Sequence, residues 1–310
     1  MVYLVGMTLL WAFSFSLIGV YLAGQVDSYF SVFMRVALAA LVFLPLLRPI
    51  PLKLAGRLMA LGAIQLGLMY VFYFHSFTLL SVPEVLIFTI LTPIYVTLIH
   101  DLIQRRFRPG YLLTAALAVI GAGIIRYSPL ESQVFFGFLV VQGANVCFAL
   151  GQVGYKVLLE RTPTAIPQRY LFGYFYLGAL AVTLMLWLAF GDMGRLPTTG
   201  LQWGILVYLG LIASGLGYFL WNKGATLVDA GTLAIMNNAL IPAGLIVNLL
   251  IWNRDADLVR LSVGGGVLLL SLLVHELWVK KSGPPHPAFL PPSPPGEGHR
   301  RKVSANQKKL

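Results

Sequence analysis

Long apolar stretches alternate with short polar connections along almost the whole chain. The stretches cover residues 2–22, 29–47, 56–78, 82–100, 110–126, 133–154, 169–190, 201–221, 229–252 and 260–279. Most approach or exceed the ~20 residues that a helix needs to cross a bilayer. A membrane β-barrel would instead alternate apolar and polar residues along strands of about 10 residues. The pattern therefore predicts an all-α integral membrane protein with ten transmembrane helices.

Composition agrees with a membrane protein. Of the 310 residues, 58% are hydrophobic and 11% charged, whereas soluble domains carry about 25% charged residues. The first stretch lacks the basic start of a secretory signal, so we expect a retained helix. Cys147 is the single cysteine, which excludes disulfides and Cys-based metal sites. Residues 280–310 are rich in proline and basic residues, which predicts a disordered tail.

The basic residues predict the orientation in the membrane. With a cytoplasmic N-terminus, 17 of the 22 Lys and Arg residues fall in inside loops and the tail, and Arg35 lies within a helix. The other four fall outside, namely Arg126, Arg195, Arg254 and Arg260. The positive-inside rule therefore places both termini in the cytoplasm. The net charge of +11 arises from these helix ends and the tail, so we expect no nucleic-acid partner.

The two halves of the chain resemble each other at an offset of 148 residues. The informative identities involve small or polar residues, namely Gly62/Gly210, Gly67/Gly215, Tyr70/Tyr218 and Thr78/Thr226. The pattern predicts two five-helix repeats, residues 1–127 and 133–279. Because five is odd, the second repeat must be inverted relative to the first. Inverted repeats are typical of secondary transporters with a substrate site near the midplane.

Arg35 is the clearest charge inside an apolar stretch, where an ionisable side chain costs roughly 2.5–3.5 kcal/mol to insert. It could bind a substrate carboxylate through a bidentate pair. It could equally form a structural ion pair with Glu84, which is predicted on the same outer side. His75, Glu84 and Asp229 are the candidates for proton coupling or for an ion pair.

Polar residues beside prolines mark a second candidate region. Proline frees the carbonyl four residues before it, so Pro242 is expected to break the helix at Asn238, and Pro93 to break its helix at Thr89. Broken helices at matching positions favour a substrate site containing Asn237 and Asn238. The alternative is that these amides only bind helices together.

Other polar side chains could complete the same site, namely Tyr70, Asn145 and Tyr218. No nucleotide-binding loop, metalloprotease motif or catalytic constellation is present in the sequence. We therefore expect a non-enzyme without cofactor or metal, and any uphill transport must draw on an ion or substrate gradient. The oligomeric state is left open.

The opening run WAFSFS (11–16), the two five-helix units and the Gly- and Pro-marked helices resemble the EamA-type drug/metabolite transporter superfamily over residues 1–280. Longer runs, above all 201–238 and 241–252, resemble proteobacterial biotin transporters within it. The resemblance implies an inner-membrane, multi-pass importer of biotin. Arg35 could bind the carboxylate of biotin, and Asn237 and Asn238 could form hydrogen bonds with its ureido ring. Tyr70 and Tyr218 could pack against its apolar bicycle. An exporter of amino acids or other small metabolites, and a non-transporting membrane receptor, are the alternatives.

Overall fold

The apolar stretches fold as helices, because a helix satisfies its own backbone hydrogen bonds inside lipid. The computed structural model describes residues 1–81, 84–85, 88–125, 132–162, 166–252 and 258–279, and these ranges contain no strand. The predicted tail at 280–310 lies outside them. Seven helical runs within the described residues are long and apolar enough to cross a membrane. The chain is thus an all-helical, multi-pass membrane protein.

Helices of the first half are interrupted by short π-helical or 3-10 segments. They are α1 (Val2–Leu17, extended by the π-helix Ile18–Leu22), α2 (Ser28–Phe43), α3 (Leu52–Gly62), the π-helix Ala63–Leu68, α4 (Met69–Leu79), the 3-10 turn Thr89–Leu91, α6 (Thr92–Gln104) and α7 (Pro109–Ile125). Asp27 caps α2 by accepting a hydrogen bond from the Phe30 amide, which satisfies one of the free N–H groups of the first turn.

The second half contains a similar series of helices. They are α8 (Ser132–Arg161), α9 (Gln168–Phe190), α10 (Gly200–Tyr208), the π-helix Leu209–Leu216, α11 (Gly217–Thr226), α12 (Ala230–Asn238), α13 (Leu240–Trp252) and α14 (Leu258–Val274, extended by the π-helix His275–Val279). Helix α8 continues to Arg161, beyond the predicted end at residue 154. The prediction that Lys156 lies in a loop was therefore wrong.

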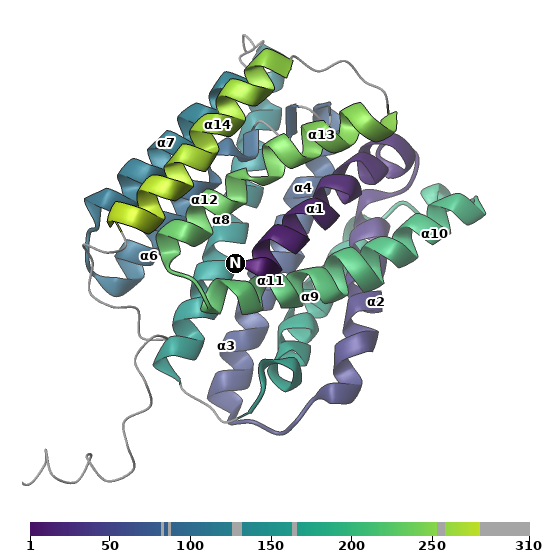
Figure 1. Ribbon diagram of the computed structural model, residues 1–310. Coiled ribbons are helices and arrows are strands. Elements are labelled where there is room, and N and C mark those ends of the chain that lie inside the picture. Colours follow the sequence, from purple (N-terminus) through teal and green to yellow (C-terminus); the bar gives the residue numbers. More distant parts are fainter. Residues whose placement is uncertain (82–83, 86–87, 126–131, 163–165, 253–257, 280–310) are drawn as a thin grey trace, which may run out of the picture.

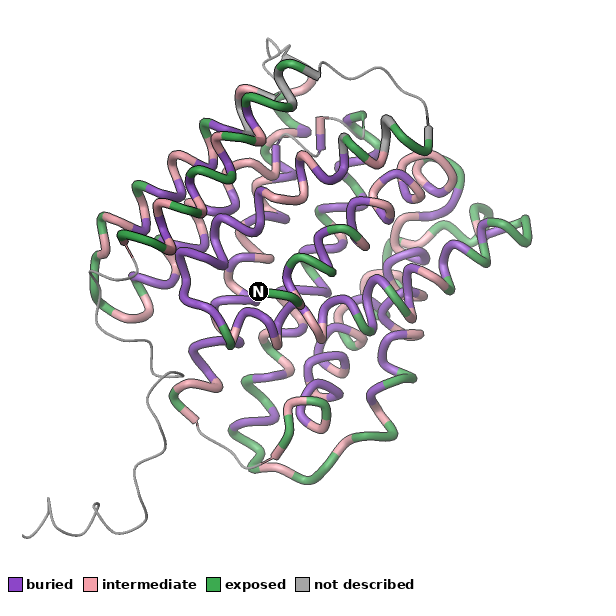
Figure 2. Tube along the Cα trace, in the orientation of Figure 1, coloured by how far each residue is buried: buried purple, intermediate pink, exposed green. Residues whose placement is uncertain are grey.

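Contacts between the two halves hold the bundle together. Helices α2 and α3 pack on α9, α4 packs on α8, α1 packs on α11 and α13, and α7 packs along α14 (Figure 1). Most fully buried positions face the interior, and many exposed positions lie on outward faces (Figure 2). Several exposed residues are large and apolar, for example Leu9, Leu113 and Leu188. Such a surface suits lipid rather than water.

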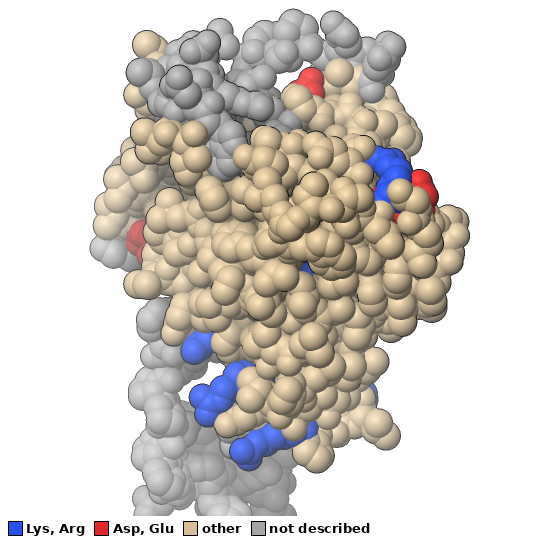
Figure 3. All heavy atoms as spheres, turned by 90° about the vertical axis from the view of Figure 1, so that its right-hand side faces the viewer, with Lys and Arg blue, Asp and Glu red and all other residues tan. Residues whose placement is uncertain are grey.

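Charged side chains are unevenly distributed over the surface of the molecule. Figure 3 shows a broad, mostly tan belt with few charged atoms, and several basic side chains gathered toward the lower end. The loop before α3 and the first turns of α3 carry exposed basic residues, namely Arg48, Lys53 and Arg57.

Glycines allow the halves to approach at backbone distance. A Cβ on Gly62 of α3 would overlap the backbone of Phe175 in α9, and a Cβ on Gly178 of α9 would overlap the backbone of Met59 in α3. Gly210 occupies the repeat position of Gly62. A Cβ added to Gly210 would lie 2.7 Å from Leu38 Cβ in α2. Small residues at such crossings are the usual means of tight helix packing in membranes.

Candidate functional site

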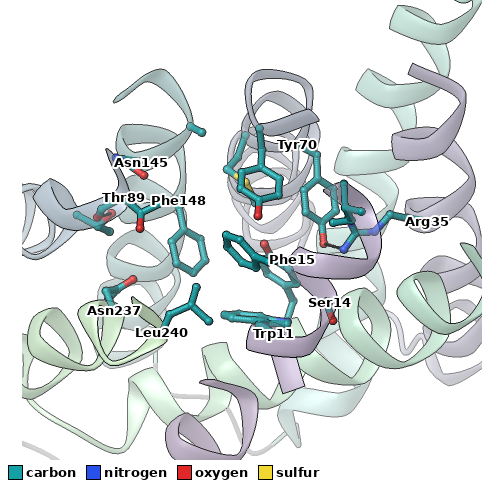
Figure 4. Close-up of a pocket in the computed structure, with 16 residues that line it drawn as sticks. Trp11, Ser14, Phe15, Arg35, Tyr70, Thr89, Asn145, Phe148, Asn237 and Leu240 are labelled. Atoms are coloured by element: carbon teal, nitrogen blue, oxygen red, sulfur yellow. Dashed lines mark hydrogen bonds between the residues drawn. The ribbon is translucent and has the colours of Figure 1, made fainter. Parts of the chain in front are cut away.

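A cavity lies inside the bundle and takes its walls from both halves of the chain. Helices α1, α2, α4, α6, α8, α11, α12 and α13 contribute. The lining residues are Trp11, Ser14, Phe15, Ile18, Arg35, Met69, Tyr70, Tyr73, Thr89, Thr92, Ala144, Asn145, Phe148, Tyr218, Asn237 and Leu240. Figure 4 shows Arg35 and Tyr70 on one side and Thr89, Asn145 and Asn237 on the other, with aromatic rings between them.

Arg35 forms the first pole of the cavity and is only 3% exposed. Its Nε donates to Ser214 Oγ at 3.1 Å, and its Nη2 donates to the Tyr70 hydroxyl at 3.0 Å. The guanidinium also lies 4.4 Å from the centre of the Tyr70 ring. Among the described residues, its Nη1 has no hydrogen-bond partner. The cavity therefore holds a buried cation with a free donor.

No acidic side chain in the described part of the chain pairs with Arg35. The expected alternative, an ion pair with Glu84, was wrong: Glu84 Oε2 accepts hydrogen bonds from the backbone N–H and the hydroxyl of Ser81, both at 2.7 Å. Ser81 and Glu84 have the spacing of a helix-capping pair, which uses the carboxylate locally. A buried guanidinium left without a carboxylate is suited to an anionic ligand.

Amide groups form the second pole. Asn145 Nδ2 donates to Phe88 O at 2.8 Å and to Gln142 Oε1 at 3.0 Å. Asn237 Oδ1 accepts from Gln152 Nε2 at 3.2 Å, and its Nδ2 donates to Leu233 O at 2.7 Å. These bonds fix two amides against the cavity wall. The amides and the Thr89 hydroxyl supply donors and acceptors for a neutral polar ligand group.

Aromatic rings separate the two poles. Trp11 lies 4.8 Å from Tyr218 and 5.0 Å from Trp221, measured between ring centroids, and Phe148 lies 6.0 Å from Trp11. Trp11 is held by a hydrogen bond from its Nε1 to Ala213 O at 2.9 Å, a carbonyl in the π-helix Leu209–Leu216. Rings fixed in this way form an apolar wall for the centre of a ligand.

The EamA-like transporter family model matches residues 1–127 and 135–276. The chain belongs to the EamA-like transporter family. It is 56% identical over 277 residues to a probable biotin transporter of Pseudomonas aeruginosa, covering 89% of this chain and 97% of that protein. It is 55% identical to the biotin transporter of Salmonella typhimurium and 54% identical to that of Escherichia coli K12, in each case covering 88% of this chain and 91% of the relative.

A solved structure described only as "Crystal structure of protein" has the same fold as this EamA-family chain. Its TM-score is 0.70 at 17% sequence identity, and the match covers 90% of this chain and 97% of that one. At this identity the likeness concerns the fold alone.

The cavity of this chain is lined by five of the six residues predicted to bind substrate, namely Arg35, Tyr70, Asn145, Tyr218 and Asn237. The sixth, Asn238, does not line it. Asn238 is fully buried, and its Nδ2 donates to Ile90 O at 3.0 Å. This hydrogen bond links the end of α12 to the turn before α6. Polar side chains often connect membrane helices in this way.

The two prolines lie near interruptions of the helices. Pro93 is in the first turn of α6, directly after the 3-10 turn Thr89–Leu91. Helix α12 ends at Asn238, and α13 starts at Leu240, so the interruption precedes Pro242. Each interruption places a cavity-lining residue at the start of a helical segment. Thr89 is the first residue of the 3-10 turn, and Leu240 is the first residue of α13.

The three predicted proton-coupling candidates do not line the cavity. His75 is exposed, and Glu84 is half-buried and caps Ser81. Asp229 is buried, and its Oδ1 lies 2.6 Å from His275 Nε2, within hydrogen-bond distance. The structure thus separates the three residues, and only Asp229 is paired with a basic side chain in the described part of the chain.

Sequence reasoning missed several site residues. Trp11 and Phe148 were hidden because an aromatic residue in an apolar stretch has no distinguishing pattern. Ser214 was hidden because a membrane serine usually bonds its own helix. Gln152 carried a usable signal: it follows Asn145 by seven positions in α8, so the two side chains share a helix face.

Proposed function

We propose that this EamA-family protein imports biotin across the inner membrane. Three relatives that it matches over most of their length are named as biotin or probable biotin transporters. The observation that carries the proposal is the two-pole cavity, with an Arg35 that lacks a carboxylate partner among the described residues and amides on the opposite wall. Biotin likewise has a carboxylate at one end and a ureido ring at the other.

The proposed pose follows from matching these groups. The valerate carboxylate binds Arg35, using the free Nη1 donor. The apolar part of the bicycle lies among Trp11, Phe148 and Tyr218. The ureido group presents two N–H donors and one carbonyl, which the second pole can bind with its amides and the Thr89 hydroxyl.

We further propose ten membrane spans in two inverted repeats, residues 1–127 and 133–279, with both termini in the cytoplasm. The family model matches two stretches that nearly coincide with these repeats. The π-helices Ala63–Leu68 and Leu209–Leu216 lie at corresponding positions, and Gly62 and Gly210 each contact a helix of the other half. Since the cavity lies between the halves, rocking one half against the other would open it alternately to each side.

The function can be tested in a biotin auxotroph that lacks its own importer. Expression of the chain is expected to restore growth and uptake of labelled biotin at nanomolar supply. No uptake by a well-expressed protein would refute import. Loss of preloaded biotin from the cells would indicate an exporter, and saturable binding without translocation would indicate a receptor.

Replacing Asn237 with alanine is expected to weaken biotin transport roughly 5- to 150-fold, because leaving a ligand's polar group unpaired in a buried site costs about 1–3 kcal/mol. The measurement is the concentration dependence of uptake, corrected for the amount of protein in the membrane. Asn238→Ala is the matched control: it removes an adjacent buried amide outside the cavity, so its KM is expected to stay unchanged. A normal KM for Asn237→Ala would reduce Asn237 to a helix contact.

Ser214 is expected to position Arg35. Its hydroxyl lies 3.1 Å from Arg35 Nε and 2.7 Å from the Tyr70 hydroxyl. Ser214→Ala should raise the KM about 5- to 10-fold without lowering the maximal rate, which corresponds to the loss of a hydrogen bond worth about 1 kcal/mol. Ser76→Ala, which removes a fully buried hydroxyl bonded to Tyr73 O, should leave KM unchanged. An equal effect of both variants would contradict the positioning role.

A further inference from the structure

Two buried polar atoms of the cavity wall have no hydrogen-bond partner in the described part of the chain. They are Arg35 Nη1 and the hydroxyl oxygen of Tyr73, and both residues line the cavity. Tyr73 follows Tyr70 by three positions in α4, so the two tyrosines share a helix face. The Tyr73 hydroxyl lies within electrostatic range of both Arg35 and Tyr70. The two unpartnered groups therefore belong to the same pole of the cavity.

The ring of Tyr73 is held in place by aromatic neighbours. Its centroid lies 5.1 Å from that of Phe15 and 4.8 Å from that of Phe77, and both pairs meet edge to face. Tyr73 is 7% exposed. A ring confined in this way has little freedom to turn its hydroxyl toward another acceptor, and burying a hydroxyl without a partner is unfavourable. The position of the hydroxyl is thus suited to an acceptor that arrives with the ligand.

A carboxylate beside Arg35 needs more donors than the arginine has available. The Ser214 and Tyr70 oxygens lie 2.7 Å apart and occupy the edge of the guanidinium formed by Nε and Nη2. An ionised carboxylate offers about four lone-pair sites, and it loses its water on entering the cavity. Arg35 Nη1 can serve some of these sites. The Tyr73 hydroxyl is a further donor at this pole that is not engaged by the described residues.

We propose that Tyr73 is a specificity-determining residue that donates a hydrogen bond to the ligand carboxylate bound by Arg35, an inference that rests on the proposed transport function. Hydrogen bonds to an ionised acceptor are about twice as strong as those between neutral groups. Tyr73 therefore favours a carboxylic acid over its neutral derivatives. Because the bond forms only with the ligand, the hydroxyl adds nothing to the stability of the ligand-free protein.

The experiment uses the purified full chain and the variant Tyr73→Phe, which keeps the ring and removes the hydroxyl. Affinities for biotin and for biotin methyl ester are measured by competition against labelled biotin. The affinity of Tyr73→Phe for biotin is expected to fall roughly 10- to 100-fold, as for the loss of a hydrogen bond to a charged group. Its affinity for the ester should fall less, so the preference for the acid becomes smaller. In Arg35→Ala, where the carboxylate is no longer held at this pole, Tyr73→Phe should have little further effect.

The thermal stability of the ligand-free protein separates a ligand contact from a structural one. Tyr73→Phe should leave the melting temperature unchanged or raise it slightly, because it removes a buried polar group without a partner. Tyr155→Phe is the matched control. Tyr155 is fully buried outside the cavity, and its hydroxyl donates to Gln168 Oε1 at 3.3 Å. This variant should melt at a lower temperature and keep the affinities for biotin and its ester.

The preference for the acid decides the proposal. If Tyr73→Phe prefers biotin over its methyl ester as strongly as the unmodified protein does, the proposal is overturned, whatever the melting temperature of the variant. A smaller preference in Tyr73→Phe, with the preference intact in Tyr155→Phe, supports it.

A second pair of ligands does not depend on biotin. Valerate is the five-carbon acid that forms the side chain of biotin, and valeramide is its neutral amide. At equal concentration valerate should protect the unmodified protein from thermal unfolding better than valeramide, and this difference should shrink in Tyr73→Phe. If the unmodified protein neither transports nor binds biotin, the proposed function is refuted, and this pair alone decides the role of Tyr73. Equal protection of the unmodified protein by valerate and valeramide would then overturn the proposal.

Discussion

Replacing Arg35 with alanine is expected to reduce the apparent affinity for biotin by roughly 30-fold to several thousand-fold. Removing one partner of a buried charge pair costs about 2–5 kcal/mol, and each 1.4 kcal/mol corresponds to about tenfold in affinity. Arg35→Lys should recover only part of the loss, since lysine keeps the charge but lacks the planar fork. Uptake of labelled biotin across a concentration series measures both variants.

The ligand provides an independent check on the role of Arg35. Biotin methyl ester lacks the negative charge, so it should compete weakly for uptake by the unmodified protein. In Arg35→Ala the ester and the acid should bind about equally, because the group that distinguishes them is gone. Arg57→Ala removes an exposed arginine of α3 and should leave the preference intact. An ester that competes as well as biotin with the unmodified protein would show that Arg35 does not bind the carboxylate.

Much of the fold could be predicted because the bilayer imposes both length and polarity on each helix. The predicted end of the sixth helix was wrong, because that helix continues through charged residues. The predicted sixth helix ends at residue 154, and the charged residues Lys156, Glu160 and Arg161 follow it. Helix α8 continues to Arg161 because Lys156 and Glu160 form a pair one turn apart at 2.8 Å, which such spacing favours.

The site could be predicted only where polarity stood out against an apolar background. Arg35 and Asn237 met that condition, because polar groups in membrane helices need a partner or a role. Asn238 met it too, yet adjacent residues on a helix point about 100° apart, so only one of the two amides lines the cavity. The Asp229–His275 pair joins residues separated by 46 positions, a contact that local pattern cannot indicate.

Gly178→Ala and Gly62→Ala are expected to lower the apparent melting temperature of the detergent-solubilised protein by roughly 5 °C or more. In each case the new methyl group would overlap the backbone of the facing helix. A backbone cannot turn aside as a side chain can, so α3 and α9 must separate. Overpacking of this kind costs about 1–3 kcal/mol or more, and 1 kcal/mol corresponds to about 2–4 °C in a chain somewhat smaller than this one.

Gly56 provides the matched control on α3 itself, because a Cβ there would meet nothing within 4 Å. Gly56→Ala should leave the melting temperature unchanged or raise it slightly, since alanine is favoured over glycine in helices by up to about 1 kcal/mol. Gly210→Ala should be milder than Gly62→Ala, because the nearest atom to the new methyl group is Leu38 Cβ at 2.7 Å, whereas at Gly62 it is the Phe175 carbonyl oxygen at 1.8 Å. If all four variants melted together, backbone contact between the halves would not be what limits the stability of the bundle.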